Sequence, residues 1–189
     1  MVKVDEALGA LRWAIAGERD GYRFYLEAAE RSADSMGKST FRDLARAEEN
    51  HLHLLLVEYE SVSSGQGWVD PEEAMSREVV VDITKPLFPG DEGVLEEGES
   101  PFGETWAAYE IDGISGDLTV LEFGMEMERR FYKTYETAAS EAKDTIGRQA
   151  YEFLMKEENE HFKLIQDAHR YLGDNKHWWD DQELPFFEG

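Results

Sequence analysis

Two short motifs of the form Glu-x-x-His could bind a metal ion. They are Glu48 with His51, and Glu158 with His161. On a helix, a spacing of three residues places both side chains on one face, where they can converge on a common point. Carboxylate oxygens together with imidazole nitrogens suit iron and manganese. The motifs therefore predict metal chemistry, provided that other elements bring them together.

The two motifs belong to an internal repeat with an offset of 110 residues. Residues 11–60 align with residues 121–170 without a gap, and 13 of these 50 positions are identical. The identities include one further glutamate in each copy, Glu18 and Glu128. Apolar residues recur at helical spacings in both copies, which is typical of amphipathic helices. The sequence thus predicts a helical hairpin that occurs twice.

An all-α four-helix bundle follows from this repeat. Asp34 and Asp144 are suited to cap the second and fourth helices, because a short carboxylate accepts hydrogen bonds from the free amides of a first turn. We expect a single domain over residues 1–189, with helices at about 5–33, 35–64, 117–142 and 144–172 and a tail at 173–189.

The acidic segment 65–116 between the two hairpins is long enough to run the length of the bundle. This length permits the topology with one crossover, in which the second and third helices start from opposite ends. Within the segment, Asp70 followed by Pro71 indicates the start of a short helix. Residues 79–83 are strand-like, although they could be only an extended part of the crossover.

The spacing also predicts that the possible ligands lie at one level of the bundle. Each hairpin has one glutamate 16 residues before its turn aspartate and another 14 residues after it, or about 21–24 Å along the helix axes. Four glutamates and two histidines are the set that a bundle uses to bind two iron or manganese ions. Buried without cations, ionised glutamates would be very costly. The alternative is that the repeat preserves only packing residues and that the carboxylates are exposed. The predicted ligands are Glu18, Glu48, His51, Glu128, Glu158 and His161.

Tyrosines near these glutamates could support the site from outside. Tyr25 and Tyr135 follow the first glutamate of each hairpin by seven residues and could donate a hydrogen bond to a metal-bound carboxylate. Tyr22 and Tyr132, at a spacing of four, are further candidates, and core packing is the alternative for all four. We expect His53 to lie at the surface or beside the site, and His169 and His177 to have structural roles. Three methionines are expected to fill the core and not to bind a heme: Met125, Met127 and Met155.

The composition narrows the class of protein. Against 42 Asp and Glu there are 19 Lys and Arg, and the net charge of −23 disfavours binding to nucleic acid or to an anionic membrane surface. The absence of cysteine excludes disulfides, thiol catalysis and cysteine-bound iron–sulfur centres within this chain. With no run of about 18 apolar residues and no visible signal peptide, a cytoplasmic location is expected. We expect the aromatic tail to pack over the bundle or across a dimer interface.

At these residues the sequence resembles the ferritin-like superfamily and, within it, the rubrerythrins. The resemblance covers about 5–64 and 117–172 and rests on the stretches 14–25, 48–51, 128–135 and 158–161. It implies a non-heme di-iron centre that reacts with peroxide or oxygen, in oxidative-stress defence or iron homeostasis, in a protein that is frequently a homodimer. Manganese or a mixed iron–manganese pair is the alternative metal content. The resemblance also makes Glu48 and Glu158 the bridging ligands.

Two departures from the rubrerythrin pattern bear on the activity. Rubrerythrins typically carry a rubredoxin domain with four cysteines, and without any cysteine this chain would need a separate electron donor, such as a rubredoxin-like or other redox protein. They also have an extra glutamate where this chain has Phe131, with Gly21 at the equivalent position of the first hairpin. The remaining six ligands resemble those of bacterioferritin, which favours ferroxidase-like behaviour. An iron-binding or storage protein, or a structural bundle with a degenerate metal site, are the other functions to consider.

Overall fold

The computed structural model of the chain describes residues 2–78 and 113–180. Its described residues form helices and no strands, which confirms the expected all-α, ferritin-like bundle. None of these helices is long and apolar enough to cross a membrane. The helices are α1 (Val2–Arg31), α2 (Ser35–Ser63), α3 (Pro71–Ser76), α4 (Gly113–Glu141) and α5 (Thr145–Asn175).

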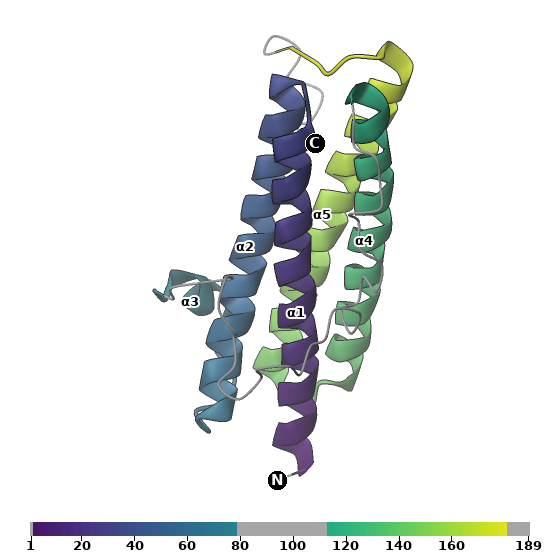
Figure 1. The fold of residues 1–189 in the computed structure, drawn as a ribbon. Coiled ribbons are helices and arrows are strands. Elements are labelled where there is room, and N and C mark those ends of the chain that lie inside the picture. The colour runs from purple at the N-terminus through teal and green to yellow at the C-terminus, as the bar shows by residue number, and fades with distance from the viewer. Residues whose placement is uncertain (1, 79–112, 181–189) are drawn as a thin grey trace.

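The four long helices form two antiparallel hairpins that lie side by side (Figure 1). The α1–α2 turn is at the upper end of the bundle in this view, and the α4–α5 turn is at the lower end. Helix α2 therefore finishes low and α4 begins high, so that these two helices run in the same direction. This arrangement is the one-crossover topology that the length of the connecting segment predicted.

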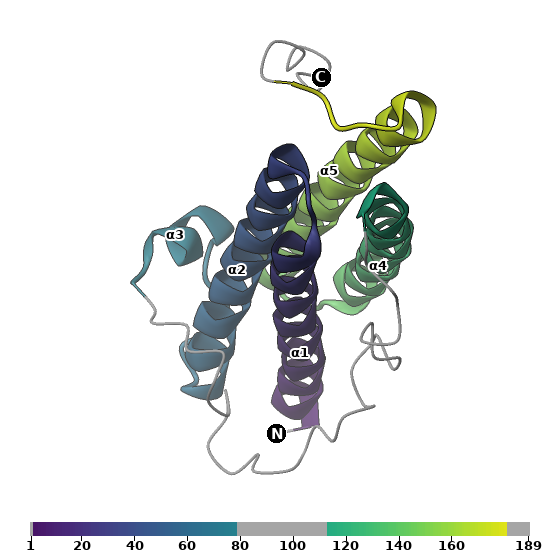
Figure 2. The ribbon, with the colours of Figure 1, turned by 45° about the horizontal axis from the view of Figure 1, so that its top comes forward.

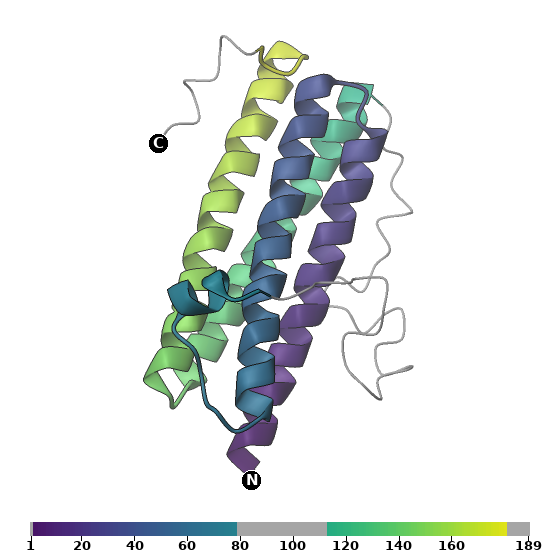
Figure 3. The same cartoon turned by 90° about the vertical axis from the view of Figure 1, so that its left-hand side faces the viewer.

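The short helix α3 lies outside the bundle, against α2 and α5 (Figures 2 and 3). Asp70 caps it by accepting hydrogen bonds from the amides of Glu72 and Glu73, and Pro71 occupies its first turn. Asp34 and Asp144 cap α2 and α5 in the same way, each accepting from two amides of the following turn. All three caps were expected from the sequence and are confirmed, because a short carboxylate beside free amides stabilises a helix start.

Two tryptophans join the hairpins reciprocally. Trp68, which follows α2, lies on Gly147 at the start of α5, and Trp178, which follows α5, lies on Gly37 at the start of α2. A Cβ at Gly147 would lie 2.5 Å from the Trp68 ring, and a Cβ at Gly37 would lie 2.9 Å from the Trp178 ring. The two tryptophans are 110 residues apart, as are the two glycines, so the repeat continues beyond the helices. Each hairpin thus packs a tryptophan ring against the turn of the other hairpin.

The largest difference from the expected helix boundaries is at α4. This helix begins at Gly113, whereas the sequence predicted a start at about 117. Asp117 does not cap the helix, because its Oδ2 accepts hydrogen bonds from Ser32 Oγ and Trp178 Nε1. Helix α5 extends to Asn175, three residues beyond the expected end. The strand-like stretch 79–83 and the last residues of the tail, 181–189, lie outside the described part. Within it, the tail residues Trp178 and Trp179 are buried against the bundle.

Candidate metal centre

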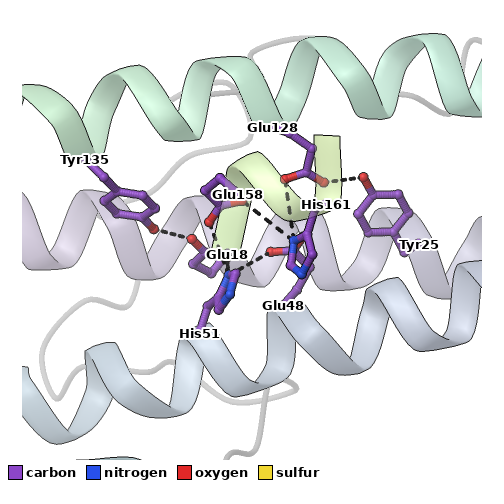
Figure 4. A network of polar contacts seen from close by, with 8 residues as sticks. All are labelled: Glu18, Tyr25, Glu48, His51, Glu128, Tyr135, Glu158 and His161. Atoms are coloured by element: carbon purple, nitrogen blue, oxygen red, sulfur yellow. Dashed lines mark hydrogen bonds and ion pairs between the residues drawn. The ribbon is translucent and has the colours of Figure 1, made fainter. Parts of the chain in front are cut away.

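The six predicted ligands meet in the interior of the bundle, and they come from four helices (Figure 4). Helices α1 and α4 supply one glutamate each, whereas α2 and α5 each supply a glutamate and a histidine one turn apart. All four glutamates are fully buried, and the two histidines are 3% and 9% exposed. Among residues 2–78 and 113–180, every cluster of three or more possible ligands is drawn from this set: Glu18, Glu48, His51, Glu128, Glu158 and His161.

Glu48 and Glu158 occupy the middle of the cluster. His51 Nδ1 lies 3.6 Å from a Glu48 oxygen and 3.2 Å from a Glu158 oxygen. His161 Nδ1 lies 3.8 Å from the other oxygen of each of the same two glutamates. The two imidazole rings are stacked with their centroids 5.1 Å apart. Both central glutamates therefore face both histidines, as ligands shared between two ions would.

Glu18 and Glu128 lie at opposite sides of the cluster. His51 Nδ1 is 3.3 Å from Glu18, and His161 Nδ1 is 3.8 Å from Glu128. The arrangement thus divides into two halves, each with one outer glutamate and one histidine, which share the central pair. This division follows the sequence repeat, since each half takes its outer glutamate and its histidine from one hairpin.

Tyrosines from the opposite hairpin hold the outer glutamates. The Tyr25 hydroxyl, on α1, donates a hydrogen bond of 2.5 Å to Glu128 Oε1 on α4. The Tyr135 hydroxyl, on α4, donates to Glu18 Oε1 on α1. Both tyrosines are fully buried. These bonds fix the orientation of two carboxylates and leave their second oxygens directed at the histidines, which is the role of a supporting hydrogen bond at a metal site.

Burial and charge divide the glutamates into two kinds. Burial raises the pKa of Glu48, and the charges of Glu128 and Glu18 raise it further. Burial likewise raises the pKa of Glu158, with Glu18 and Glu128 adding to the effect. For Glu18, burial is outweighed by the nearby His51, so that its pKa is lowered. The central glutamates are therefore the ones whose ionised form most needs a neighbouring cation.

Unpaired polar atoms show that the cluster suits metal ions. Both oxygens of Glu48 and of Glu158 are buried without a hydrogen-bond partner, as are Glu128 Oε2 and His161 Nδ1. A buried polar atom normally has a partner, and leaving one without it costs about 1–3 kcal/mol. Here several such atoms converge on the same small volume. Oxygen and nitrogen donors left open in this way fit two divalent cations of the iron or manganese type.

The remaining sequence candidates lie around or outside this cluster. Tyr132 is half-buried and lines a hollow beside Glu128 and Glu158, and Tyr22 is half-buried near Glu49, whose charge adds to the effect of burial in raising its pKa. His53 is half-buried on α2, His169 pairs with Glu122 at the surface, and His177 contacts the carbonyl of Trp178.

The two positions that depart from the rubrerythrin pattern adjoin the site. Phe131 is fully buried, and its ring is stacked on that of Tyr135 with the centroids 6.1 Å apart. A Cβ at Gly21 would lie 3.5 Å from the carboxyl carbon of Glu48. Neither position supplies a carboxylate, and a side chain added at Gly21 would contact Glu48.

One glycine contributes to the site in a way that the sequence analysis missed. A Cβ at Gly124 would lie 2.9 Å from the Tyr25 hydroxyl oxygen, which is closer than real Cβ contacts come. Gly124 therefore leaves the space through which Tyr25 reaches Glu128. The equivalent residue of the first hairpin is Ala14, so the repeat gave no signal, although an isolated glycine inside a helix points to a close approach.

Comparisons with known proteins bear on the family and the fold. A family model described as Rubrerythrin matches residues 9–169. Among solved structures, the chain is similar to a dodecameric thioferritin, the bacterioferritin-related protein from Bacteroides fragilis. The TM-score is 0.63 at 17% sequence identity, and the match covers 92% of this chain and 89% of that one. A search of curated proteins gave no match. At this identity the structural neighbour establishes the fold alone.

Proposed function

This chain belongs to the rubrerythrin family, whose members are di-iron proteins of iron handling and oxidative-stress defence, and on that premise we propose that it oxidises a bound ferrous pair with peroxide or oxygen. One observation carries the proposal. Glu48 and Glu158 both face the two histidines, and all four of their oxygens lack hydrogen-bond partners. Such a pair has the arrangement of two bridging carboxylates.

In this proposal each half of the cluster holds one ion. Glu18 and His51 would bind the first, Glu128 and His161 the second, and the central glutamates would bind both. When bound, two ferrous ions would supply the two electrons that, together with two protons, reduce one molecule of hydrogen peroxide to two molecules of water. Manganese suits the same donors, so the proposal includes an iron–manganese pair.

The protein's own residues prepare the site for this reaction. Tyr25 and Tyr135 hold the outer glutamates by hydrogen bonds, so those carboxylates are oriented before the ions arrive. The surrounding burial excludes water and strengthens every charge interaction inside the cluster. Because the chain has no cysteine, electrons that restore the ferrous state would come from a separate redox protein, such as a rubredoxin-like donor.

Iron storage is the second candidate, and one observation favours it. The structural neighbour is described as a dodecamer, and a closed assembly of this kind could enclose iron in bulk. A homodimer that binds two ions per chain would instead fit the redox enzyme. The mass in solution together with the iron content after aerobic loading distinguishes the two.

An anaerobic titration followed by rapid mixing tests the main proposal. We expect two ferrous ions per chain, and oxidation by peroxide or oxygen within seconds of mixing. Glu48→Gln should reduce the stoichiometry or weaken binding about 10–100-fold or more, since it removes a charged bridge. Glu49→Gln, at the exposed neighbouring position, is the matched control and should behave as the parent protein. A chain that retains no metal would contradict the proposal and favour a structural bundle with a degenerate site.

A further inference from the structure

A hollow between α4 and α5 leads from the surface toward the candidate metal centre. It has a volume of about 160 Å³ and is lined by Glu128, Arg129, Tyr132, Glu158, Asn159 and Phe162. Two of the predicted ligands therefore form its inner wall. Both are fully buried, so in this conformation the hollow ends against them without exposing their oxygens.

The outer wall consists of side chains that can move. Phe162 and Tyr132 are half-buried, and the Arg129 guanidinium lies over the Phe162 ring, 5.5 Å from its centroid. Arg129 also pairs with Glu126 at the surface. Exposed side chains change rotamer within nanoseconds, which is fast compared with most enzyme turnover. Rotation of the Phe162 ring together with Arg129 would shorten the distance between solvent and the cluster.

The equivalent face of the first hairpin is closed differently. Leu52 stands in the repeat where Phe162 stands in the second hairpin, and it is fully buried. Glu49 takes the place of Asn159, which gives that face a negative charge. The two faces of the cluster are thus unequal although the ligands themselves repeat. Arg19 and Tyr22 match Arg129 and Tyr132, so the difference lies in Phe162 and Asn159 on the face between α4 and α5.

We propose that a peroxide- or oxygen-sized oxidant enters between α4 and α5, and that Phe162 limits its size. This inference rests on the proposed function, since it names the route by which the oxidant reaches the ferrous pair. The outer wall disfavours an entering divalent cation, because Arg129 carries a positive charge there beside the Tyr132 and Phe162 rings. The hollow of about 160 Å³ has room for a small organic molecule as well as for water, so the size limit would lie at the Phe162 ring, which lines the approach to the fully buried Glu128 and Glu158.

Substitution of Phe162 by a smaller residue tests the size limit. In the metal-loaded protein, Phe162→Ala should speed the reaction with tert-butyl hydroperoxide at least tenfold, while the rate with hydrogen peroxide changes less than threefold. Phe153→Ala is the matched control, because Phe153 is a half-buried phenylalanine on the same helix that does not line the hollow. The proposal is overturned if both variants change the two rates alike.

A binding measurement separates this inference from the proposed function. The rate at which azide associates with the loaded centre, followed by absorption, reports access without any turnover. Phe162→Ala should raise this rate, and Phe162→Trp should lower it. An unchanged azide rate in both variants would disprove the route even if the protein reacts with peroxide. A further outcome is that the azide rate rises in Phe162→Ala and falls in Phe162→Trp while the parent protein reacts with neither peroxide nor oxygen. In that case the route stands and the proposed function fails.

Metal loading provides a further discriminating result. The rate of Co²⁺ uptake by the metal-free protein should be nearly the same in the parent, Phe162→Ala and Phe162→Trp. If uptake instead follows the size of residue 162, the hollow is an entrance for the metal, and the assignment to the oxidant is wrong.

Discussion

The hydroxyl groups of Tyr25 and Tyr135 connect the two hairpins at the scale of single residues. Each crosses the bundle to hold a glutamate on the opposite hairpin, so the position of either carboxylate depends on how the hairpins pack. The pKa of Tyr25 is raised by burial and by the charges of Glu128 and Glu48, and the phenol therefore stays protonated and remains a donor. A change that displaces one hydroxyl should disturb the metal site without touching a ligand.

Gly124→Ala makes such a change. The new methyl group would lie 2.9 Å from the Tyr25 hydroxyl oxygen and should push it away from Glu128. We expect a loss of stability of about 1–3 kcal/mol from overpacking and a 10–100-fold weaker metal affinity from the lost hydrogen bond. Thermal unfolding and a competitive metal titration measure the two effects.

The control for this prediction is Gly9→Ala on α1, where a Cβ meets nothing within 4 Å. Alanine at an open helical position should stabilise the protein by about 0.5–1 kcal/mol and leave metal binding unchanged. A Gly124→Ala protein that binds metal as tightly as the Gly9→Ala protein would show that the Tyr25 bond does not position Glu128.

The ligand types and their common level could be predicted from the sequence, because helical geometry converts spacing along the chain directly into height. Helical spacing did not indicate that Glu48 and Glu158 face both histidines, since this depends on how far the two hairpins rotate against each other; only the family resemblance made them the bridging ligands. Spacing did not indicate the role of Gly124 either, since that role exists only once Tyr25 is packed beside it. Tyrosines at spacings of four and seven were equal candidates in the sequence, and only packing separates them.

At the scale of elements, the end of α2 and the segment that leads to α3 depend on one buried acid. Glu58 is fully buried, and its Oε2 accepts a hydrogen bond of 3.0 Å from the amide of Val69. Its Oε1 has no partner, and neither has the Tyr151 hydroxyl. Burial raises the pKa of Glu58 to about 7, although the Val69 amide lowers it in part. Folding therefore favours the protonated form of this side chain.

This raised pKa predicts a loss of stability as the pH rises from about 5 to 8. In the unfolded chain Glu58 has a pKa near its ordinary value of 4.5, so between that value and about 7 the folded protein binds more protons. The stabilisation is complete below pH 4.5 and is lost as the pH passes 7. Glu58→Gln, which can still accept from Val69, should remove this part of the dependence in thermal unfolding. Glu60→Gln, at an exposed position, should keep it, and two identical pH profiles would contradict the prediction.

The helices and their caps were readable from the sequence, because capping chemistry and apolar spacing are local signals. The contacts of Trp68 and Trp178 with the opposite hairpin were not, although both tryptophans obey the same offset as the ligands. A tryptophan after a helix gives no local indication of its partner. The early start of α4 was missed as well: Asp117 lies inside this helix, and its bonds to Ser32 and Trp178 have no local signal in the sequence.

At the scale of the whole molecule, the interior of the bundle carries an unusual concentration of acid. Four glutamates are fully buried around two histidines, in a chain whose net charge is already −23. Without cations, the repulsion among these carboxylates and their loss of hydration oppose folding. The metal-free protein should therefore be less stable than its size suggests, and metal should restore the difference.

Neutralising the central pair tests this balance. In the metal-free protein, Glu48→Gln together with Glu158→Gln should increase stability on the order of 2 kcal/mol, or about 4–8 °C in Tm. With metal at a free concentration of ~1,000 times Kd, the free energy of unfolding of the parent protein should rise by about 4 kcal/mol. In the double variant the same metal concentration should raise it much less. Thermal unfolding with and without ferrous or manganous ion measures both effects. Glu49→Gln with Glu160→Gln, both exposed, is the control, and an equal response of the two double variants would count against a destabilising metal-free centre.

The division of the cluster between the two hairpins has a consequence for assembly. Each hairpin carries two of the four glutamates and one of the two histidines, so one hairpin alone offers half a site. Separate hairpins would complete the set only by meeting in solution, and their metal affinity would fall on dilution. Joining both in one polypeptide replaces that encounter with a fixed local concentration. Metal binding by this chain should therefore be independent of protein concentration.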